Sequence, residues 1–234
     1  MLDTRFARFA GDIGDPASHA GGALFERVPQ ATAARVVGGI ASLSDPAERA
    51  DAVAPFVAAG RRLVARGASA ITTSCGFLVA YQAELAAALP VPVMTSALCL
   101  LPEVAAGQVE GAQLGILTFD AASLGAMHLR AAGHSGRCVI EGLAPGCGFR
   151  RAVLEDAAED GLAAREADVL DAARRLKARA PRLGVVVLEC TNFPPHRAAV
   201  SACTGVGVVD VWDVVRRLRE ESGRRDPLQA ATPR

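Results

Sequence analysis

Two cysteines stand where a thiol can do chemistry. Cys75 ends the apolar run AITTSC, Cys190 ends VVVLEC, and a helical stretch follows each of them. Between a strand end and a helix start, backbone N–H groups and the positive end of the helix dipole favour the thiolate. The next residues, Gly76, Thr191 and Asn192, are small or polar, so an anionic substrate can approach those N–H groups. The sequence therefore predicts two reactive thiols.

Placed on opposite sides of one substrate, the two thiols form an acid/base pair. One cysteine, as thiolate, removes a proton from a carbon next to a carboxylate, and the other delivers a proton to the opposite face. Nearby donors must stabilise the enediolate-like charge, and we expect them to be Ser74, Thr118, Thr191 and Asn192. Glu189 precedes the second cysteine and, by strand alternation, is expected to point away from it in a structural role.

An internal repeat relates the two cysteines. Cys75 and Cys190 align at an offset of 115 residues, with ITTSCGF over VLECTNF after one slip. The same offset places MLDT over ILTF, so that Asp3 falls on Thr118, and VPVMTS over VGVVDV. Three strand ends match in register, which indicates an ancestral duplication.

Short apolar runs alternate with alanine-rich amphipathic stretches, the pattern of parallel strands covered by helices. The expected strands are Ala68–Thr73, Val91–Thr95, Gln113–Thr118, Arg137–Glu141, Leu183–Leu188 and Val206–Val211. The expected helices are Pro46–Arg66, Leu78–Ala88, Ser96–Ala105, Ala121–Ala132, Arg150–Ala180 (one kinked helix or two, broken at Gly161), Pro195–Cys203 and Val214–Glu221. The fold class is α/β.

The repeat predicts two pseudo-symmetric α/β units with mostly parallel sheets and an active-site cleft between them. Residues 1–105 and 206–234 would form the first domain and residues 106–205 the second, with the last strand and helix returning to the first unit. Ligands bind at the carboxyl ends of parallel strands. The cleft would therefore be lined by Asp3, Cys75, Thr95, Thr118, Cys190 and Asp210.

Composition excludes several classes of function. The 234 residues carry 25 Lys and Arg against 25 Asp and Glu, so nothing in the net charge favours a nucleic acid or an anionic membrane as partner. No apolar run is long enough to span a bilayer, and the first residues do not resemble a signal peptide, so we expect a cytoplasmic protein. The six cysteines are expected as thiols there; no C-x-x-C pair and only four scattered histidines argue against a metal site.

Four segments carry a resemblance to a known family: MLDT, TTSCGF, GILTF and ECTNFPPH. Together they make the chain similar to the aspartate/glutamate racemase superfamily, which includes hydantoin racemases, maleate isomerases and arylmalonate decarboxylases. The resemblance implies chemistry without pyridoxal phosphate or another cofactor, two α/β domains, and an active site between them. It also implies that Asp3 and Thr4 match the family's first-strand pair, which orients the substrate or a thiol.

The chain departs from the family pattern at both cysteines. Many amino-acid racemases have Asn-Thr after the first cysteine, where this chain has Gly76 and Phe77. Asn192 stands where glutamate racemases have a histidine, and the nearest histidine, His196, could assist instead. Phe77 and Phe193 indicate a pocket less polar than a glutamate side chain requires. Another amino acid, a hydantoin or a related small carboxylate is the expected substrate.

Two other functions stay open. One cysteine could attack the substrate covalently, as in the maleate isomerases, with the other as proton donor. A non-catalytic small-ligand binder could also have two α/β units around a cleft, but it would leave the matched cysteines unexplained. A decarboxylase needs only one thiol. The sequence does not identify the substrate, and it leaves a homo-oligomer open.

Overall fold

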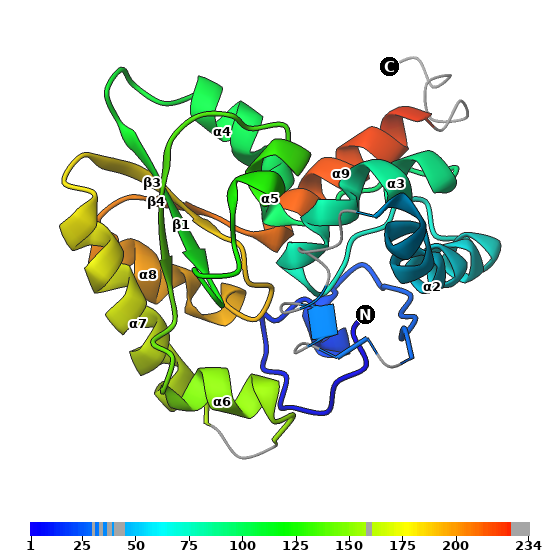
Figure 1. Cartoon of the computed structure of the whole chain (residues 1–234), viewed down its shortest axis with the longest axis horizontal. Helices are drawn as coiled ribbons and strands as arrows, with labels where there is room; N and C mark the ends of the chain where they lie inside the picture. The colour runs from blue at the N-terminus through cyan, green and yellow to red at the C-terminus, as the bar shows by residue number, and fades with distance from the viewer. Residues whose placement is uncertain (30, 33–34, 37–38, 40–44, 158–160, 226–234) are drawn as a thin grey trace.

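The structure is a computed structural model that describes residues 1–29, 31–32, 35–36, 39, 45–157 and 161–225 (Figure 1). Its strands are β1 (Gln113–Thr118), β2 (Cys138–Gly142), β3 (Leu183–Leu188) and β4 (Gly207–Val209). Its α-helices are α2 (Pro46–Ala65), α3 (Gln82–Ala88), α4 (Leu101–Ala106), α5 (Ala126–Ala131), α6 (Gly148–Leu154), α7 (Leu162–Arg179), α8 (Arg197–Thr204) and α9 (Val211–Arg225). Its 3-10 helices are η1 (Pro16–Ser18), η3 (Gly76–Tyr81), η4 (Ala97–Leu100) and η5 (Pro194–His196).

A parallel sheet with the strand order β2-β1-β3-β4 organises the second half of the chain. The α/β class is confirmed, and β1 and β3 have the bounds that the sequence predicted. Both are apolar runs whose residues are mostly buried, as expected of strands covered on two faces. Because the strands are parallel, β1 and β3 both end near Thr118 and Glu189.

Helices cover both faces of this sheet. α7 contacts β1 and β2, and α8 contacts α7 and β4, while α4 and α5 lie on the other side (Figure 1). A glycine allows the close approach of α7: a Cβ at Gly115 would lie 2.9 Å from Leu176 of that helix and 2.6 Å from Leu183. Gly115 of β1 and Leu176 of α7 thus fit against each other at this face of the sheet.

The first half of the chain holds less regular strand structure than expected. The predicted strands 68–73 and 91–95 form one parallel bridge, Ile71 with Val93, and a second bridge joins Leu2 to Val28. Thr72 and Thr73 donate side-chain hydrogen bonds of 2.8 and 2.7 Å to the carbonyls of Met94 and Thr95. These two hydroxyl groups therefore bind carbonyl oxygens that backbone N–H groups would bind in a continuous parallel sheet.

Helix boundaries shift where the chain turns. The expected helix 150–180 is two helices, α6 and α7, with residues 158–160 outside the described part. The expected helix 78–88 begins as the 3-10 helix η3 and becomes α-helical only at Gln82. Asp45 accepts the backbone N–H groups of Ala47 and Glu48 and so caps the start of α2.

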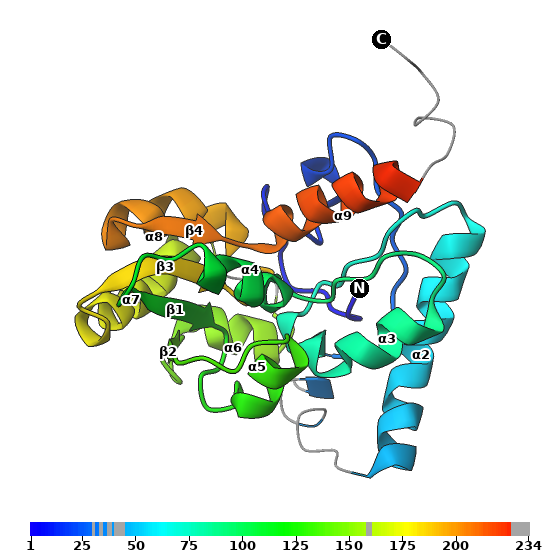
Figure 2. The same cartoon turned by 90° about the horizontal axis from the view of Figure 1, so that it is seen from above.

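The last strand does not return to the first half, which corrects the expected placement. β4 pairs in parallel with β3, with Val186 opposite Val208, so it belongs to the sheet of the second half. Only α9 leads away from β4 toward α2 and α3 (Figure 2), and it packs against η4. Within the described residues, no helix is both long enough and apolar enough to cross a membrane.

Candidate active site

Both predicted cysteines line one small cavity. It has a volume of about 30 Å³, and Cys75 and Cys190 are 8% and 6% exposed. Its wall is formed by Leu2, Phe6, Ser74, Cys75, Gly76, Phe77, Phe119, Val153, Glu189, Cys190, Thr191 and Asn192. Two segments that are 115 residues apart in the sequence thus meet around a single space.

Backbone hydrogen bonds hold Cys75 at its turn. The Cys75 N–H donates to Thr73 Oγ1 (3.3 Å), and Leu78 N–H closes the first turn of η3 on the Cys75 carbonyl (3.1 Å). Ser74 Oγ accepts the N–H of Leu2 (3.0 Å), which ties the turn to the Leu2–Val28 bridge. The side chain of Ser74 is therefore already engaged in the structure.

The second cysteine is tied to the first through its neighbour. Thr191 Oγ1 donates to the carbonyl of Ser74 (2.8 Å), a hydrogen bond between the two cysteine-bearing turns. Cys190 Sγ donates to Asn192 Oδ1 at 3.8 Å, and Phe193 N–H donates to the Cys190 carbonyl (3.0 Å). These contacts fix the relative placement of the two turns.

The segment that follows the Leu2–Val28 bridge adds a charged pair that the sequence reasoning missed. Asn192 Nδ2 donates to Asp12 Oδ2 (2.6 Å), and Arg8 Nη1 contacts Asp12 Oδ1 at 3.0 Å. Arg8 Nη2 also donates to Thr4 Oγ1 (3.1 Å). Asp12 is buried, and the guanidinium of Arg8 is largely covered. The four-residue spacing of an Arg and an Asp was the only sequence signal for this pair.

Glu189 is a further residue of the site that the sequence reasoning did not include. It was expected to point away from Cys190, but it lines the same cavity and is 1% exposed. Its Oε2 accepts a 2.6 Å hydrogen bond from Thr118 Oγ1, while Oε1 is buried without a hydrogen-bond partner. Strand alternation does not fix the direction of Glu189, because β3 ends at Leu188.

Burial makes both thiols weaker acids, which corrects the expectation of favoured thiolates. It raises the pKa of Cys75 to about 12 and that of Cys190 well above its usual value, and the Glu189 carboxylate raises both further. The N–H groups of Phe77 and Leu78 do lower the Cys75 pKa, as a helix start should. They are outweighed because burial removes most of the water from the thiol, and η3 is only a short 3-10 helix.

The remaining predicted residues divide into two groups. Ser74, Gly76, Phe77, Thr191 and Asn192 line the cavity with the cysteines. Asp3, Thr4, Thr118, His196, Thr95 and Asp210 do not.

Asp3 is exposed, and its carboxylate lies 3.7 Å from Arg27 Nη1. His196 is buried beside Phe149, with Nδ1 3.5 Å from Glu166 Oε2, and burial lowers its pKa. Asp210 is buried against Arg197 and accepts the N–H of Trp212 near the start of α9, the capping role considered for it. These three side chains are occupied away from the sulfurs.

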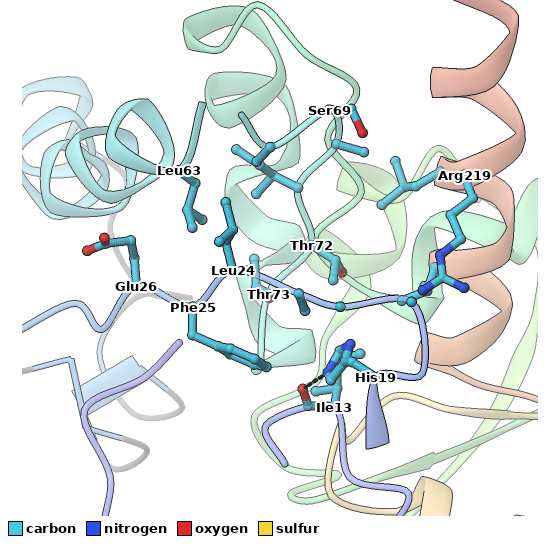
Figure 3. Close-up of a pocket in the computed structure, with 18 of the residues that line it drawn as sticks. Ile13, His19, Leu24, Phe25, Glu26, Leu63, Ser69, Thr72, Thr73 and Arg219 are labelled. Carbon is cyan, nitrogen blue, oxygen red and sulfur yellow. Dashed lines mark hydrogen bonds between the residues drawn. The ribbon is translucent and has the colours of Figure 1, made fainter. Parts of the chain in front are cut away.

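A much larger hollow lies elsewhere among the described residues. It has a volume of about 590 Å³ and is formed by loop residues such as Leu24 and Phe25, by Thr72 and Thr73, and by Arg219 of α9 (Figure 3). Neither cysteine lines it, although Ser74 borders both spaces. Size alone would select this hollow, but the small cavity is lined by both cysteines and by the buried Glu189. We therefore place the candidate chemistry at the small cavity.

Comparison with known proteins identifies the family. A family model described as Asp/Glu/Hydantoin racemase matches residues 22–217, which include both cysteines. The chain belongs to the Asp/Glu/hydantoin racemase family. Among the described residues of this family member, no group of three or more His, Cys, Asp or Glu side chains could hold a metal ion.

Its curated relatives are named as lyases. The chain is 28% identical over 215 residues to a dimethylsulfoniopropionate lyase of Durusdinium sp. clade D, covering 89% of this chain and 69% of the relative. It is 27% identical over 217 residues to dimethylsulfoniopropionate lyase 3 of Emiliania huxleyi, covering 89% of this chain and 55% of the relative. The chain thus spans little more than half of the second protein. These names indicate that relatives of this family member are enzymes.

A solved structure supports the fold. Unliganded arylmalonate decarboxylase superimposes with a TM-score of 0.50 at 20% identity, covering 77% of this chain and 79% of that one. At this identity the likeness concerns the fold alone.

Proposed function

We propose that this protein is a cofactor-independent enzyme that inverts a carbon next to a carboxylate or carbonyl, with Cys75 and Cys190 as its acid/base pair. The observation that carries the proposal is that both cysteines line one cavity. Family membership supports an enzyme of this general class. The substrate class is an amino acid, a hydantoin or a related small acid.

In this reaction one cysteine ionises and takes the proton from the carbon, and the other returns a proton to the opposite face. The negative charge that develops on the carboxylate or carbonyl oxygen needs donors near the cysteine turns. Ser74 and Asn192 line the cavity, and the Ser74 hydroxyl and the second amide proton of Asn192 are the donors we assign. Thr191 lines the cavity too, but its one hydroxyl proton is donated to the Ser74 carbonyl, so it holds the two turns together instead. The roles of the two cysteines exchange when the reaction runs in reverse.

The strand pairing supports a pseudo-symmetric origin of this two-sided site. Ile71 pairs with Val93, and the residues 115 positions further along, Val186 and Val208, pair in the same parallel manner. The offset is the one that relates Cys75 to Cys190. Equivalent strand ends in two copies of one unit would present their thiols to a shared space.

The site has to open before a substrate can bind. A space of about 30 Å³ holds roughly one water molecule, whereas small-molecule sites are on the order of 300–1,000 Å³. Phe6 forms part of the wall, and its segment is held by Asp156 Oδ1, which accepts the Phe6 N–H at 2.9 Å. We infer that this segment moves outward when substrate binds.

A lyase is the second candidate, because the curated relatives carry that name. Elimination begins with the same step, in which a thiolate removes the proton next to a carboxylate. The electron pair of the broken C–H bond then forms a double bond and expels a leaving group from the neighbouring carbon. Only one of the two cysteines is needed as base.

Proton NMR and chiral chromatography in D₂O distinguish these functions. The panel contains amino acids, hydantoins, small dicarboxylates and dimethylsulfoniopropionate. A racemase gives inversion with deuterium at the inverted carbon; a lyase gives an unsaturated product; a covalent isomerase gives isomerisation of a double bond. A pure ligand binder turns over none of them, and that result across the panel would overturn the proposal.

Cysteine variants test the two-base scheme on the substrate so identified. Cys75→Ser and Cys190→Ser should each reduce inversion by about 10²-fold or more, while one-face deuterium exchange persists in at least one of them. Cys203→Ser, on α8 and outside the cavity, is the matched control and should keep wild-type activity. Substantial inversion by either cavity variant contradicts the scheme.

A further inference from the structure

A buried carboxyl group stands beside both thiols without a role in the reaction described above. Glu189 lines the cavity with Cys75 and Cys190, and its Oε1 atom has no hydrogen-bond partner. A buried polar atom without a partner is costly, so such an atom at the wall of a reactive cavity calls for a functional reason.

The neighbouring turn is shaped to receive this carboxyl group. A Cβ at Gly76 would lie 2.2 Å from Glu189 Oε1 and 2.2 Å from the Glu189 carbonyl oxygen. The residue after the first cysteine therefore has no side chain, and the carboxyl group of Glu189 occupies the space that one would fill. Thr118 holds the other oxygen, Oε2, from the end of β1.

We propose that Glu189 carries the single negative charge of the resting site and exchanges it for a proton from whichever cysteine must act as base. In this step the S–H bond of one cysteine breaks, an O–H bond forms on Glu189, and the total charge is unchanged. Glu189 does not touch the substrate in this scheme. It acts through the thiols, because it accepts the proton that one of them must lose. The inference rests on the two-cysteine function proposed above.

The acidities of the three groups agree with this assignment. Burial raises the pKa of Glu189 to about 7, far below the pKa of about 12 for Cys75. The first proton to leave the cluster therefore comes from Glu189. Asp120 raises its pKa further, and Thr118 and the Phe119 N–H lower it. Among the charged groups that face the thiols, Arg8 lowers the Cys75 pKa and Asp12 raises that of Cys190.

Sharing one charge gives the thiols an unusual dependence on pH. Below the pKa of Glu189, the population with one thiolate rises tenfold per pH unit, as for any thiol. Above it, the form with an ionised carboxyl and two neutral thiols rises equally fast, so the fraction of thiolate formed by proton transfer to Glu189 stays constant. A second charge beside the ionised Glu189 is disfavoured by repulsion, because the Glu189 carboxylate raises the pKa of both thiols. Reaction of the cysteines with an alkylating reagent should therefore reach a plateau near pH 7, well below the pKa of the thiols.

Iodoacetamide alkylation from pH 5 to 9.5, followed for each cysteine by peptide mass spectrometry, tests this. Wild-type Cys75 and Cys190 should show the plateau. Glu189→Gln should match wild type below about pH 7 and then rise above it, by up to about 100-fold at pH 9. Thr118→Val should move the start of the plateau up by roughly one pH unit, because a hydrogen bond to the charged form is lost.

Two further variants separate a charge effect from disturbed folding. Glu189→Asp retains a carboxyl group and should retain a plateau. Glu103→Gln removes an exposed carboxylate of α4 that does not line the cavity and should leave the profile unchanged. A wild-type profile without a plateau, or the same plateau in Glu189→Gln, would overturn the inference. Because the assay uses no substrate, either result leaves the NMR test of the proposed function intact.

Discussion

Gly76→Ala should destabilise the protein through one identifiable clash. The added Cβ would lie 2.2 Å from both the carbonyl oxygen and Oε1 of Glu189, about 0.8 Å inside the 3.0 Å that real Cβ contacts respect. The side chain could shift, but the carbonyl belongs to a backbone whose N–H donates to Leu117 at the end of β1 (2.8 Å). Overpacking of this kind costs roughly 1–3 kcal/mol, and the fixed carbonyl places this substitution near 3.

Urea denaturation provides the assay, with Gly146→Ala as matched control. A Cβ at Gly146 would meet nothing within 4 Å, so the free energy of unfolding should change by less than about 0.5 kcal/mol. Gly76→Ala combined with Glu189→Ala removes the contact with Oε1 but not with the carbonyl oxygen, so it should recover only part of the loss. If Gly76→Ala is as stable as wild type, the described packing of the two cysteine turns is wrong.

Three further predictions concern buried ionisable side chains. Because the pKa of Glu189 rises from 4.5 to about 7 on folding, the folded state holds a proton that the unfolded state releases between these values. Wild type should therefore lose about 3 kcal/mol of stability relative to Glu189→Gln as pH rises from 4.5 to 7, measured by urea denaturation; a constant difference would contradict this. Arg165 is buried against Phe6, Phe9 and Phe149 and donates to the Ala7 carbonyl, so Arg165→Met should cost about 2 kcal/mol and speed proteolysis of the first residues. His196→Leu should leave the rate of deuterium exchange within about twofold of wild type, because His196 lies outside the cavity. A larger loss would show that His196 assists the reaction.

The parts of the fold that could be predicted rest on local patterns. β1 and β3 are uninterrupted apolar runs bounded by polar residues, so their bounds follow from hydrophobicity alone. The two cysteines could be placed at one cavity because parallel strand ends meet at one edge and the repeat related the two segments.

The parts that were missed depend on contacts between distant segments. The charged pair Arg8 and Asp12 reaches the site through Asn192, which is 180 residues from Asp12 in the sequence. No local pattern reports such a contact.

Burial was the other source of error. The N–H groups at the helix start do lower the Cys75 pKa, but the loss of water around the sulfur raises it by more, and no sequence pattern reports that loss. The expected strand 68–73 failed for a similar reason, because its threonine hydroxyls bond to the neighbouring carbonyls. Propensity and alternation do not include these tertiary effects.

The central claim is that two sulfur atoms face one small space. Treatment with 1,3-dichloroacetone, which links two thiols through a short bridge, followed by peptide mass spectrometry, tests it without a substrate. One bridge joining the Cys75 and Cys190 peptides is expected, and it should disappear in Cys75→Ser. Separate adducts on the two cysteines, with no bridge between them in the folded wild-type protein, would contradict it.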